Sequence, residues 1–552
     1  MRGRLIFAFL AFTALPAAAV AQPAPAPAKP AAIIRGRVTA ADTGRPLRRA
    51  QISVVMASST QERRTTSTNS RGEYELRELV AGRYTLTVTR SGYLPWEYGR
   101  RAPGEPGRTL EVDEGAALEK IDLAMPRAGV IGGRVIDETG EPVAGVTVWV
   151  MRSQFFRGRR TLVPAGSSAR TDDTGQYRAL SLLPGNYLVV AMLAETWVAA
   201  GEKKQVFGYA PTFFPSTAAA ADAQRVTLQA GKEVANVDIA LVAMPAATIS
   251  GTATRGDGAP LAGASVSLNQ NIIGPSGGSY RSVASARVDA EGNWRFRDLP
   301  AGEYELDVSA NNPDGVRESA VTTVVANGTD IAGLALVAAG PVTVSGEVVT
   351  DQGTALAPGD SRPRVVADSL VPGSPRPLIP DGNDAGLVTT TGTFSLKTTS
   401  GPAVIQVWSL PKGWALKSVE AGGRESPDNV IDVKPGGKLE GVKVVVTNRL
   451  PAVTGRIVDD KGADAEGVIV LFPEDQARWL GIGDNIRFGR ADQKGQVRLE
   501  NVPPGDYLAI ALQTVQPWQV ADPEFLATLK DAASKVTVRE GQPSQLTLKI
   551  KI

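Results

Sequence analysis

The chain has 552 residues, and at about 100 to 200 residues per domain this length implies several separate hydrophobic cores. Its 59 basic and 57 acidic residues are interspersed and give a net charge of +2, so we expect no nucleic-acid partner. The sequence contains no histidine and no cysteine, which excludes a Ser-His-Asp triad, a cysteine nucleophile, disulfide bonds and an ordinary zinc or copper site. We therefore expect no metal and no cofactor.

The first 21 residues have the pattern of an export signal, with a basic head at Arg2 and Arg4, an apolar run over residues 5–15 and small residues at 19–21. An uncleaved anchor is the alternative, but the apolar run is short for a bilayer. No later stretch reaches the roughly 18 apolar residues of a membrane helix, so we expect no transmembrane segment in the mature chain. The pattern predicts export to the periplasm or the extracellular space.

Residues 22–31 alternate alanine and proline and predict a stiff linker. A sequence block then recurs at intervals of 95 to 118 residues, and each copy has a glycine in its first apolar strand. A second glycine follows seven or eight residues later and predicts a turn that needs positive φ. The paired glycines are Gly36 and Gly44, Gly133 and Gly140, Gly251 and Gly258, Gly346 and Gly353, and Gly455 and Gly462.

Each copy continues with another glycine turn and an alternating strand. In the third copy Trp294 and Phe296 are expected to point to one side of the strand while Arg295 and Arg297 point to the other. A Pro-Gly-x-Tyr phrase follows in several copies, as at 184–187, and favours a type II turn with the tyrosine ring directed to the core. Short, alternating strands close each copy, which makes the chain all-β.

We therefore predict an all-β protein of five tandem Ig-like or prealbumin-like β-sandwich modules in an elongated array, after an N-terminal signal peptide. Short joints between the copies favour independent units with limited play. The predicted ranges are signal peptide 1–21, linker 22–31, and modules one to five at 32–126, 127–245, 246–340, 341–450 and 451–552.

The second module carries these phrases most fully, at 133–135, 140–146, 171–177 and 183–187. They resemble the carboxypeptidase regulatory-like domain, a transthyretin-like sandwich of seven strands. Modules one, two, three and five resemble it well, whereas module four has Ser-Gly-Pro-Ala at 400–403 in place of Gly-x-Tyr. The resemblance implies the fold for nearly the whole mature chain, but little about function, because this module is an accessory to many proteins.

Aromatic residues gather in segments that depart from the repeat, in modules one and two. Rings on loops can bind a sugar or a peptide, with arginines to anchor a polar or acidic group; the alternative is that these loops fold back and cap the sandwich ends. The candidate residues are Tyr93, Trp96, Tyr98, Phe155, Phe156, Arg157, Trp197, Tyr209, Phe213 and Phe214. Module five adds a predicted helix with Asp522 as N-cap and Pro523 in its first turn, which we interpret as a lid.

Two motifs resemble catalytic motifs, of aspartic proteases and of Ser-x-x-Lys enzymes, but we interpret both as structural. The Asp-Thr-Gly triplets at 42–44 and 173–175 occupy different turns of the repeat, and Ser409 and Lys412 are separated by a helix-breaking proline. We predict a non-catalytic structural and binding protein that presents loops to a glycan or to an envelope or extracellular protein. A carbohydrate-binding accessory in polysaccharide uptake or degradation is the alternative, and a hydrolase that works without histidine is a distant one.

Overall fold

The structure is a computed structural model, and it describes residues 31–551 except 57–58, 106, 157–158, 200–204, 275–276, 314, 357–361, 371–385, 412, 435–436, 480–484 and 492–494. The predicted signal peptide and all but the last residue of the linker lie outside the described residues. Among the described residues, no helix is both long enough and apolar enough to cross a membrane.

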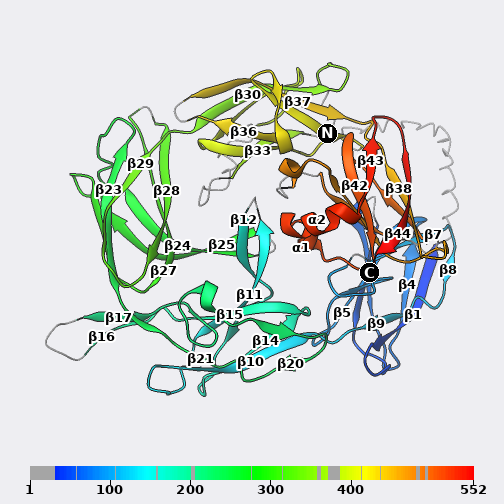
Figure 1. Cartoon of the computed structure of the whole chain (residues 1–552), viewed down its shortest axis with the longest axis horizontal. Helices are drawn as coiled ribbons and strands as arrows, with labels where there is room; N and C mark the ends of the chain where they lie inside the picture. Colours follow the sequence, from blue (N-terminus) through cyan, green and yellow to red (C-terminus); the bar gives the residue numbers. More distant parts are fainter. Residues whose placement is uncertain are drawn as a thin grey trace, which may run out of the picture.

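The chain is built of tandem β-sandwiches, as predicted, but they do not form an elongated array. Figure 1 shows the modules following one another around a ring, with the last one beside the first. Arg101 and Arg108 of module one both form ion pairs with Glu466 of module five, which closes the ring. The short joints set only the angle between neighbours, whereas these long-range contacts decide the overall shape.

The third module shows the basic sandwich. Three strands form one sheet in the order β26-β23-β29, and four form the other in the order β25-β24-β27-β28. Trp294 and Phe296 are buried while Arg295 and Arg297 are exposed, which confirms the predicted alternation. The strands are β23 (Ala247–Arg255), β24 (Ser265–Gly274), β25 (Gly277–Arg287), β26 (Asn293–Leu299), β27 (Gly302–Asn311), β28 (Arg317–Ala326) and β29 (Ile331–Ala338).

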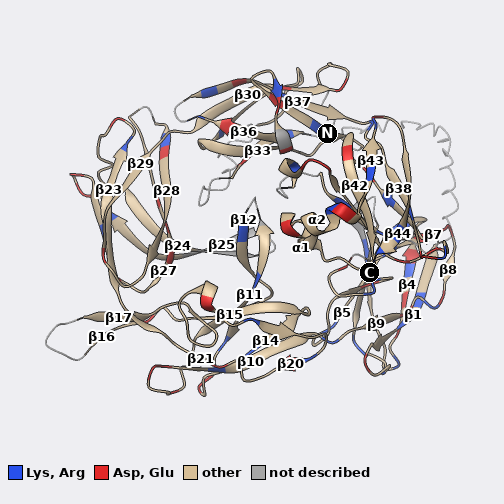
Figure 2. Cartoon of the chain, viewed as in Figure 1, with Lys and Arg blue, Asp and Glu red and all other residues tan. Residues whose placement is uncertain are grey.

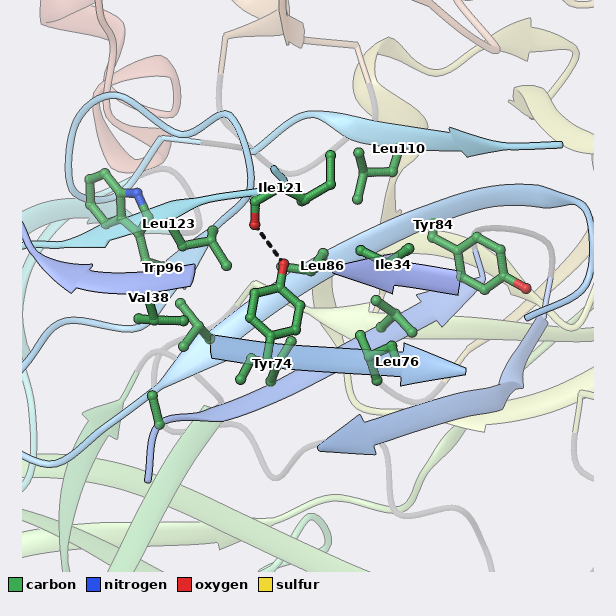
Figure 3. Close-up of a cluster of buried hydrophobic side chains, with 14 of the residues drawn as sticks. Ile34, Val38, Tyr74, Leu76, Tyr84, Leu86, Trp96, Leu110, Ile121 and Leu123 are labelled. Carbon is green, nitrogen blue, oxygen red and sulfur yellow. Dashed lines mark hydrogen bonds between the residues drawn. The ribbon is translucent and has the colours of Figure 1, made fainter. Parts of the chain in front are cut away.

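The first module repeats this plan around a separate hydrophobic core, which Figure 3 shows. Its sheets contain β4-β1-β8 with β9, and β3-β2-β5-β6 with β7. The strands are β1 (Ala32–Ala40), β2 (Gln51–Met56), β3 (Ser59–Ser67), β4 (Glu73–Leu79), β5 (Gly82–Thr89), β6 (Trp96–Glu97), β7 (Thr109–Val112), β8 (Ala117–Leu118) and β9 (Leu123–Met125).

The second module adds a long hairpin, β11-β12, and a small separate sheet, β16-β17-β22. Its hydrophobic cluster is again distinct from those of its neighbours. Its elements are β10 (Gly129–Ile136), β11 (Thr147–Phe156), β12 (Arg159–Pro164), β13 (Ala169–Arg170), β14 (Gln176–Leu182), β15 (Gly185–Met192), β16 (Thr196–Val198), β17 (Val206–Tyr209), β18 (Thr212–Phe213), η1 (Ala220–Asp222), β19 (Val226–Leu228), β20 (Glu233–Val234), β21 (Ile239–Ala240) and β22 (Ala243–Pro245).

The fourth module differs in topology. After β33 the chain crosses to the other sheet, where β34 pairs with β37, so that sheet has the order β32-β30-β37-β34-β35 and the second has β31-β33-β36. Its elements are β30 (Val342–Thr350), β31 (Arg364–Ser369), β32 (Thr393–Thr398), β33 (Gly401–Trp408), β34 (Ala415–Ala421), β35 (Arg424–Glu425), η2 (Pro427–Asn429), β36 (Val430–Val433) and β37 (Lys438–Thr447).

The fifth module joins its strands in one path, β40-β39-β42-β44-β38-β41, with β43 beside β42. Strand β39 is buried on both faces, because a second hydrophobic cluster packs outside the sandwich under the helices. The elements are β38 (Val453–Val458), β39 (Val468–Pro473), η3 (Gln476–Arg478), β40 (Arg487–Arg490), β41 (Gln496–Leu499), β42 (Gly505–Leu512), α1 (Pro517–Val520), α2 (Pro523–Leu529), η4 (Lys530–Ala532), β43 (Ser534–Val538) and β44 (Ser544–Lys551).

The glycine of the first strand in each of modules one to four is explained by a close approach of backbone. A Cβ at Gly36 would overlap the carbonyl oxygen of Ile121, and one at Gly251 would overlap that of Leu334. The same holds for Gly133 with Val237 and Gly346 with Val442. The Ile121 carbonyl also accepts a hydrogen bond from the Tyr74 hydroxyl (2.7 Å; Figure 3). A larger residue would force the first and last strands apart.

The Pro-Gly-x-Tyr turn is not the type II turn that we predicted. The left-handed residue of this corner lies four positions before the glycine, at Ser181 (φ 62°) in module two and Asp298 (φ 55°) in module three. Gly185 is extended, at φ 158°, and begins strand β15. The tyrosine ring does enter the core, and the Tyr187 hydroxyl donates to the Leu183 carbonyl (2.5 Å). The hydrogen bond of the Tyr187 hydroxyl therefore stabilises this turn, whereas we had expected Gly185 to form it with a positive φ.

The excised third module, residues 246–340, is expected to unfold in one cooperative transition, because its buried cluster is its own. In that fragment Gly251→Ala should lower the free energy of unfolding by about 1–3 kcal/mol, the usual cost of overpacking. Gly256→Ala is the control, since the nearest atom to its added Cβ lies 3.9 Å away. Urea unfolding followed by tryptophan fluorescence measures both, and equal effects of the two variants would contradict the close-approach account.

Candidate functional site

The aromatic residues predicted in module one lie in or against its core. Trp96 is only 7% exposed and packs in the hydrophobic cluster of Figure 3, with the Arg100 guanidinium 5.7 Å from its ring centre. Tyr98 packs partly buried against the same cluster. Tyr93 does too, and the guanidinium groups of Arg90 and Arg127 lie 5.6 Å and 5.4 Å from its ring centre. The burial of Trp96 supports the alternative that the insertion folds back and caps the sandwich, and ligand binding by these residues stays a prediction.

Truncating this residue tests the capping role. Trp96→Ala in the excised first module, residues 32–126, should lower the free energy of unfolding by about 3–5 kcal/mol, as for other buried aromatic rings. Trp294→Ala, at 3% exposure in the third module, is the core reference. Thermal and urea unfolding measure both losses. A loss below about 1 kcal/mol for Trp96→Ala would place its ring outside the core.

In module two the predicted residues divide into two groups. Trp197 stacks on Phe207 with 6.2 Å between ring centres and tilts against Tyr209 at 4.7 Å, and the Tyr209 hydroxyl donates to Glu138 (3.0 Å). All three rings are partly buried, and Tyr209 lines a hollow of about 330 Å³ against Pro300 of module three. This group remains a candidate contact surface.

The other predicted residues of module two do not join that group. Phe213 is half-buried on β18, which pairs with β15, and Phe214 packs against the core of the module. Phe155 is half-buried near the end of β11. Arg157 and the side chain of Phe156 lie outside the described residues.

The hairpin β11-β12 reaches the helices of module five. Arg160 forms ion pairs with Asp522 (3.0 Å) and Glu524 (2.8 Å), and the Arg152 guanidinium lies 3.7 Å from the ring centre of Trp518. Asp522 is also the N-cap of α2, accepting from the amide of Glu524 (3.0 Å), as predicted. Figure 2 shows basic residues on β12 facing acidic residues of the helices. We expected arginines of this segment to bind an acidic group of a ligand. Arg160 instead binds two acidic residues of the same chain, Asp522 and Glu524.

A buried ion pair joins modules one and five. The guanidinium of Arg490 in β40 contacts the carboxylate of Glu105, and the two side chains are only 3% and 1% exposed. Burial lowers the pKa of Arg490, and the charge of Glu105 opposes that effect. Gly104, beside Glu105, packs against Gln516 and Trp518 at the start of α1. Three segments that depart from the repeat thus meet in one region. They are the loop of module one, the hairpin of module two and the helices of module five.

The ion pair can be broken at one end. Glu105→Gln leaves the Arg490 charge buried without its partner, which typically costs about 3–5 kcal/mol. We expect faster amide hydrogen exchange in residues 99–105 and 516–520, with the cores of both modules unaffected. Arg101→Ala is the control, because its ion pair with Glu466 is 60% exposed on the arginine side and such pairs contribute about 0–1 kcal/mol. Unchanged exchange in Glu105→Gln would show that the pair does not hold the modules together.

A larger hollow, about 630 Å³, lies at the junction of modules four and five, and we call it the junction pocket. Module four contributes Trp408, at the end of β33, and Trp414, which precedes β34. The crossing of the chain from one sheet to the other places both rings at this end of the sandwich. Trp408 is 47% exposed, whereas Trp414 packs partly buried against the core.

Three polar residues form the floor of the junction pocket. Asn485 donates to Asp428 Oδ1 (2.7 Å) and accepts from Arg478 (3.1 Å), so the network bridges the two modules. Asp428 is 4% exposed with a left-handed backbone (φ 51°), and its Oδ2 has no hydrogen-bond partner among the described residues. Burial raises the pKa of the Asp428 carboxyl, against the opposing effects of Arg478 and Asn485. Such strained, buried polar groups are more common at functional sites than elsewhere.

Sequence reasoning missed the junction pocket. Its aromatic wall belongs to module four, the copy with the weakest motifs, and the floor combines residues 57 positions apart. The sequence feature that could have indicated it is the pair of tryptophans at 408 and 414, which follow the segment of module four that lacks the Gly-x-Tyr phrase.

Comparison with known proteins agrees with the sandwich architecture. The sequence model of the carboxypeptidase regulatory-like domain matches residues 33–125, 130–242 and 248–337, more than half of the chain. The chain therefore belongs to the carboxypeptidase regulatory-like domain family. The matched ranges lie in the first three modules, so the expected resemblance of module five is not among them. No curated protein matches the chain.

Several solved structures of bacterial pilins are similar to parts of the chain. The minor pilin GBS52 of Streptococcus agalactiae is 12% identical, over 38% of this chain and 94% of the pilin, with a TM-score of 0.21. A streptococcal ancillary pilin is 13% identical, over 56% of this chain and 98% of its own, also with a TM-score of 0.21. The major pilin subunit BcpA of Bacillus cereus is 11% identical, over 56% and 99% of the two chains, with a TM-score of 0.14. TM-scores this low carry no argument about arrangement or function.

Proposed function

We propose that the chain is a non-catalytic, exported structural and binding protein, and that its partner is a glycan or an extracellular protein recognised where two modules meet. Export is supported by the signal pattern of residues 1–21. The observation that carries the binding role is the junction pocket, a hollow walled by tryptophan rings and floored by polar groups. Pockets of about 300 to 1,000 Å³ with this mixed lining are typical of ligand sites.

Two of the three acidic residues that line the junction pocket have fixed partners within the chain. Asp428 is held by Asn485, and Asp475 caps a helical turn by accepting from the amide of Ala477 (3.0 Å). Neither lies beside a histidine or cysteine, because the sequence has none.

A glycan is favoured over a protein partner by the shape of the surface. A stable protein interface buries about 1,200–2,000 Å² and is usually flat, whereas the junction pocket is concave and small. A role as an accessory in polysaccharide uptake or degradation is the second candidate, and the exposed Trp408 ring favours it because a long polymer can lie across such a ring.

Binding of the purified mature chain, residues 22–552, to a glycan array tests the proposal. We expect retention of a defined set of glycans without release of shorter products, since recognition needs no bond cleavage. Retention of polymers and not of short oligosaccharides would favour the polysaccharide accessory. If no glycan is retained, glycan binding is contradicted. If shortened products appear in the supernatant, the non-catalytic assignment is contradicted.

A further inference from the structure

We infer that the junction pocket takes an uncharged saccharide, with the sugar ring against Trp408 and its hydroxyl groups toward the polar residues of module five. This inference rests on the proposed function and adds the chemical class of the ligand and its orientation in the pocket.

The aromatic wall is suited to a sugar ring. Trp408 is 47% exposed, although a large apolar side chain of this kind is normally buried. Its indole nitrogen already donates to Gln406 (3.2 Å), so what remains to a ligand is the face and edge of the ring. The C–H face of a pyranose complements such a surface, because the aromatic face is negative and the C–H bonds are weakly positive.

Each basic residue of the junction pocket has a polar partner. Arg478 donates to Asn485 (3.1 Å), Arg487 donates to the carbonyl of Asn501 (3.2 Å), and Lys417 pairs with Glu540 (2.7 Å). The lining matches these three basic residues with three acidic ones, Glu425, Asp428 and Asp475, so its formal charges balance and it offers an anion no net attraction. The pocket is therefore a poor receptor for phosphate or for uronic acids.

Acidic and basic groups are also balanced around the floor. Asp428 faces Arg478 at 3.8 Å, which offsets its charge, and the two residues come from different modules. A cationic ligand would meet that arginine as well as the carboxylate. Uncharged hydroxyl groups can both donate and accept, so they suit a floor that mixes amide, carboxylate and guanidinium groups.

Asp428 acts here as a positioning residue. Its Oδ2 is buried without a hydrogen-bond partner among the described residues, while its Oδ1 accepts from Asn485 and lies 3.8 Å from Arg478, so the carboxylate holds these two side chains in place. A ligand in the pocket touches both modules at once, and we expect it to stiffen the junction between them.

The experiment uses the full mature chain and titration calorimetry with short neutral gluco-, manno-, galacto- and xylo-oligosaccharides, with uronic-acid oligosaccharides as the charged comparison. We expect a neutral oligosaccharide to bind, and Trp408→Ala to weaken its binding by about tenfold or more. Trp149→Ala is the matched control: it removes a partly buried tryptophan of β11, outside the junction pocket, and should leave binding unchanged. Trp197→Ala tests the aromatic group of module two as a competing site. Circular dichroism melts confirm that the three variants are folded.

The possible outcomes separate this inference from the proposed function. Loss of binding in Trp197→Ala but not in Trp408→Ala would overturn the junction pocket and leave glycan binding in place. Binding of uronic-acid oligosaccharides alone would overturn the uncharged class. If the wild-type chain binds no oligosaccharide while it retains longer glycans on the array, the pocket assignment fails; if it binds neither, the glycan proposal fails with it.

Discussion

Among the ion pairs that join modules one and five, the pair between Glu105 and Arg490 is the most deeply buried. Taking two charges out of water is costly, and the attraction between them offsets that cost only when both are present in good geometry. Such a contact contributes little to stability compared with an apolar one, but it strongly disfavours every arrangement in which one partner is buried alone. A loop of module one therefore has one favoured docking place on module five, and the tandem chain becomes a ring (Figure 1).

The repeats and the departures from the repeats have different roles. The repeated glycines and tyrosines build the sandwiches, through the close approach at Gly36 and the hydroxyl of Tyr74, for example. The insertions build the contacts between sandwiches: Arg160 of the hairpin binds Asp522 of the helix, and the start of α1 packs on Gly104. Segments that seem to be free loops in the sequence are thus mostly occupied by other parts of the same chain. The junction pocket remains open because the topology of module four leaves the Trp408 ring uncovered.

How far the sequence could predict this structure depends on the range of the interactions. Local patterns sufficed for the alternation of Trp294 and Phe296, for the turn glycines such as Gly44, and for the helix that begins after Asp522. The burial of Trp96 was one of two alternatives that the sequence left open, since a loop aromatic can either cap a core or face a ligand. The partner of Arg160 could not be predicted, because it lies 362 positions away along the chain. The ring has the same origin: Glu105 and Arg490 are 385 positions apart, and no periodic pattern links them. The junction pocket required knowing that β34 changes sheets, which the motifs of module four do not indicate.

The closure of the ring can be measured directly because the chain has no cysteine of its own. Arg101→Cys combined with Glu466→Cys introduces two thiols at the contact between modules one and five. The double variant removes the ion pairs of Glu466 with Arg101 and Arg108 but leaves the buried pair of Glu105 and Arg490 in place. A short bismaleimide added to the dilute protein should link residues 101 and 466 within one molecule, detected by mass spectrometry of the digested chain. Adding Glu105→Gln should reduce the yield. The account predicts an intramolecular cross-link as the main product, and its absence, with both thiols reactive and the modules folded, would show that the chain is an open array.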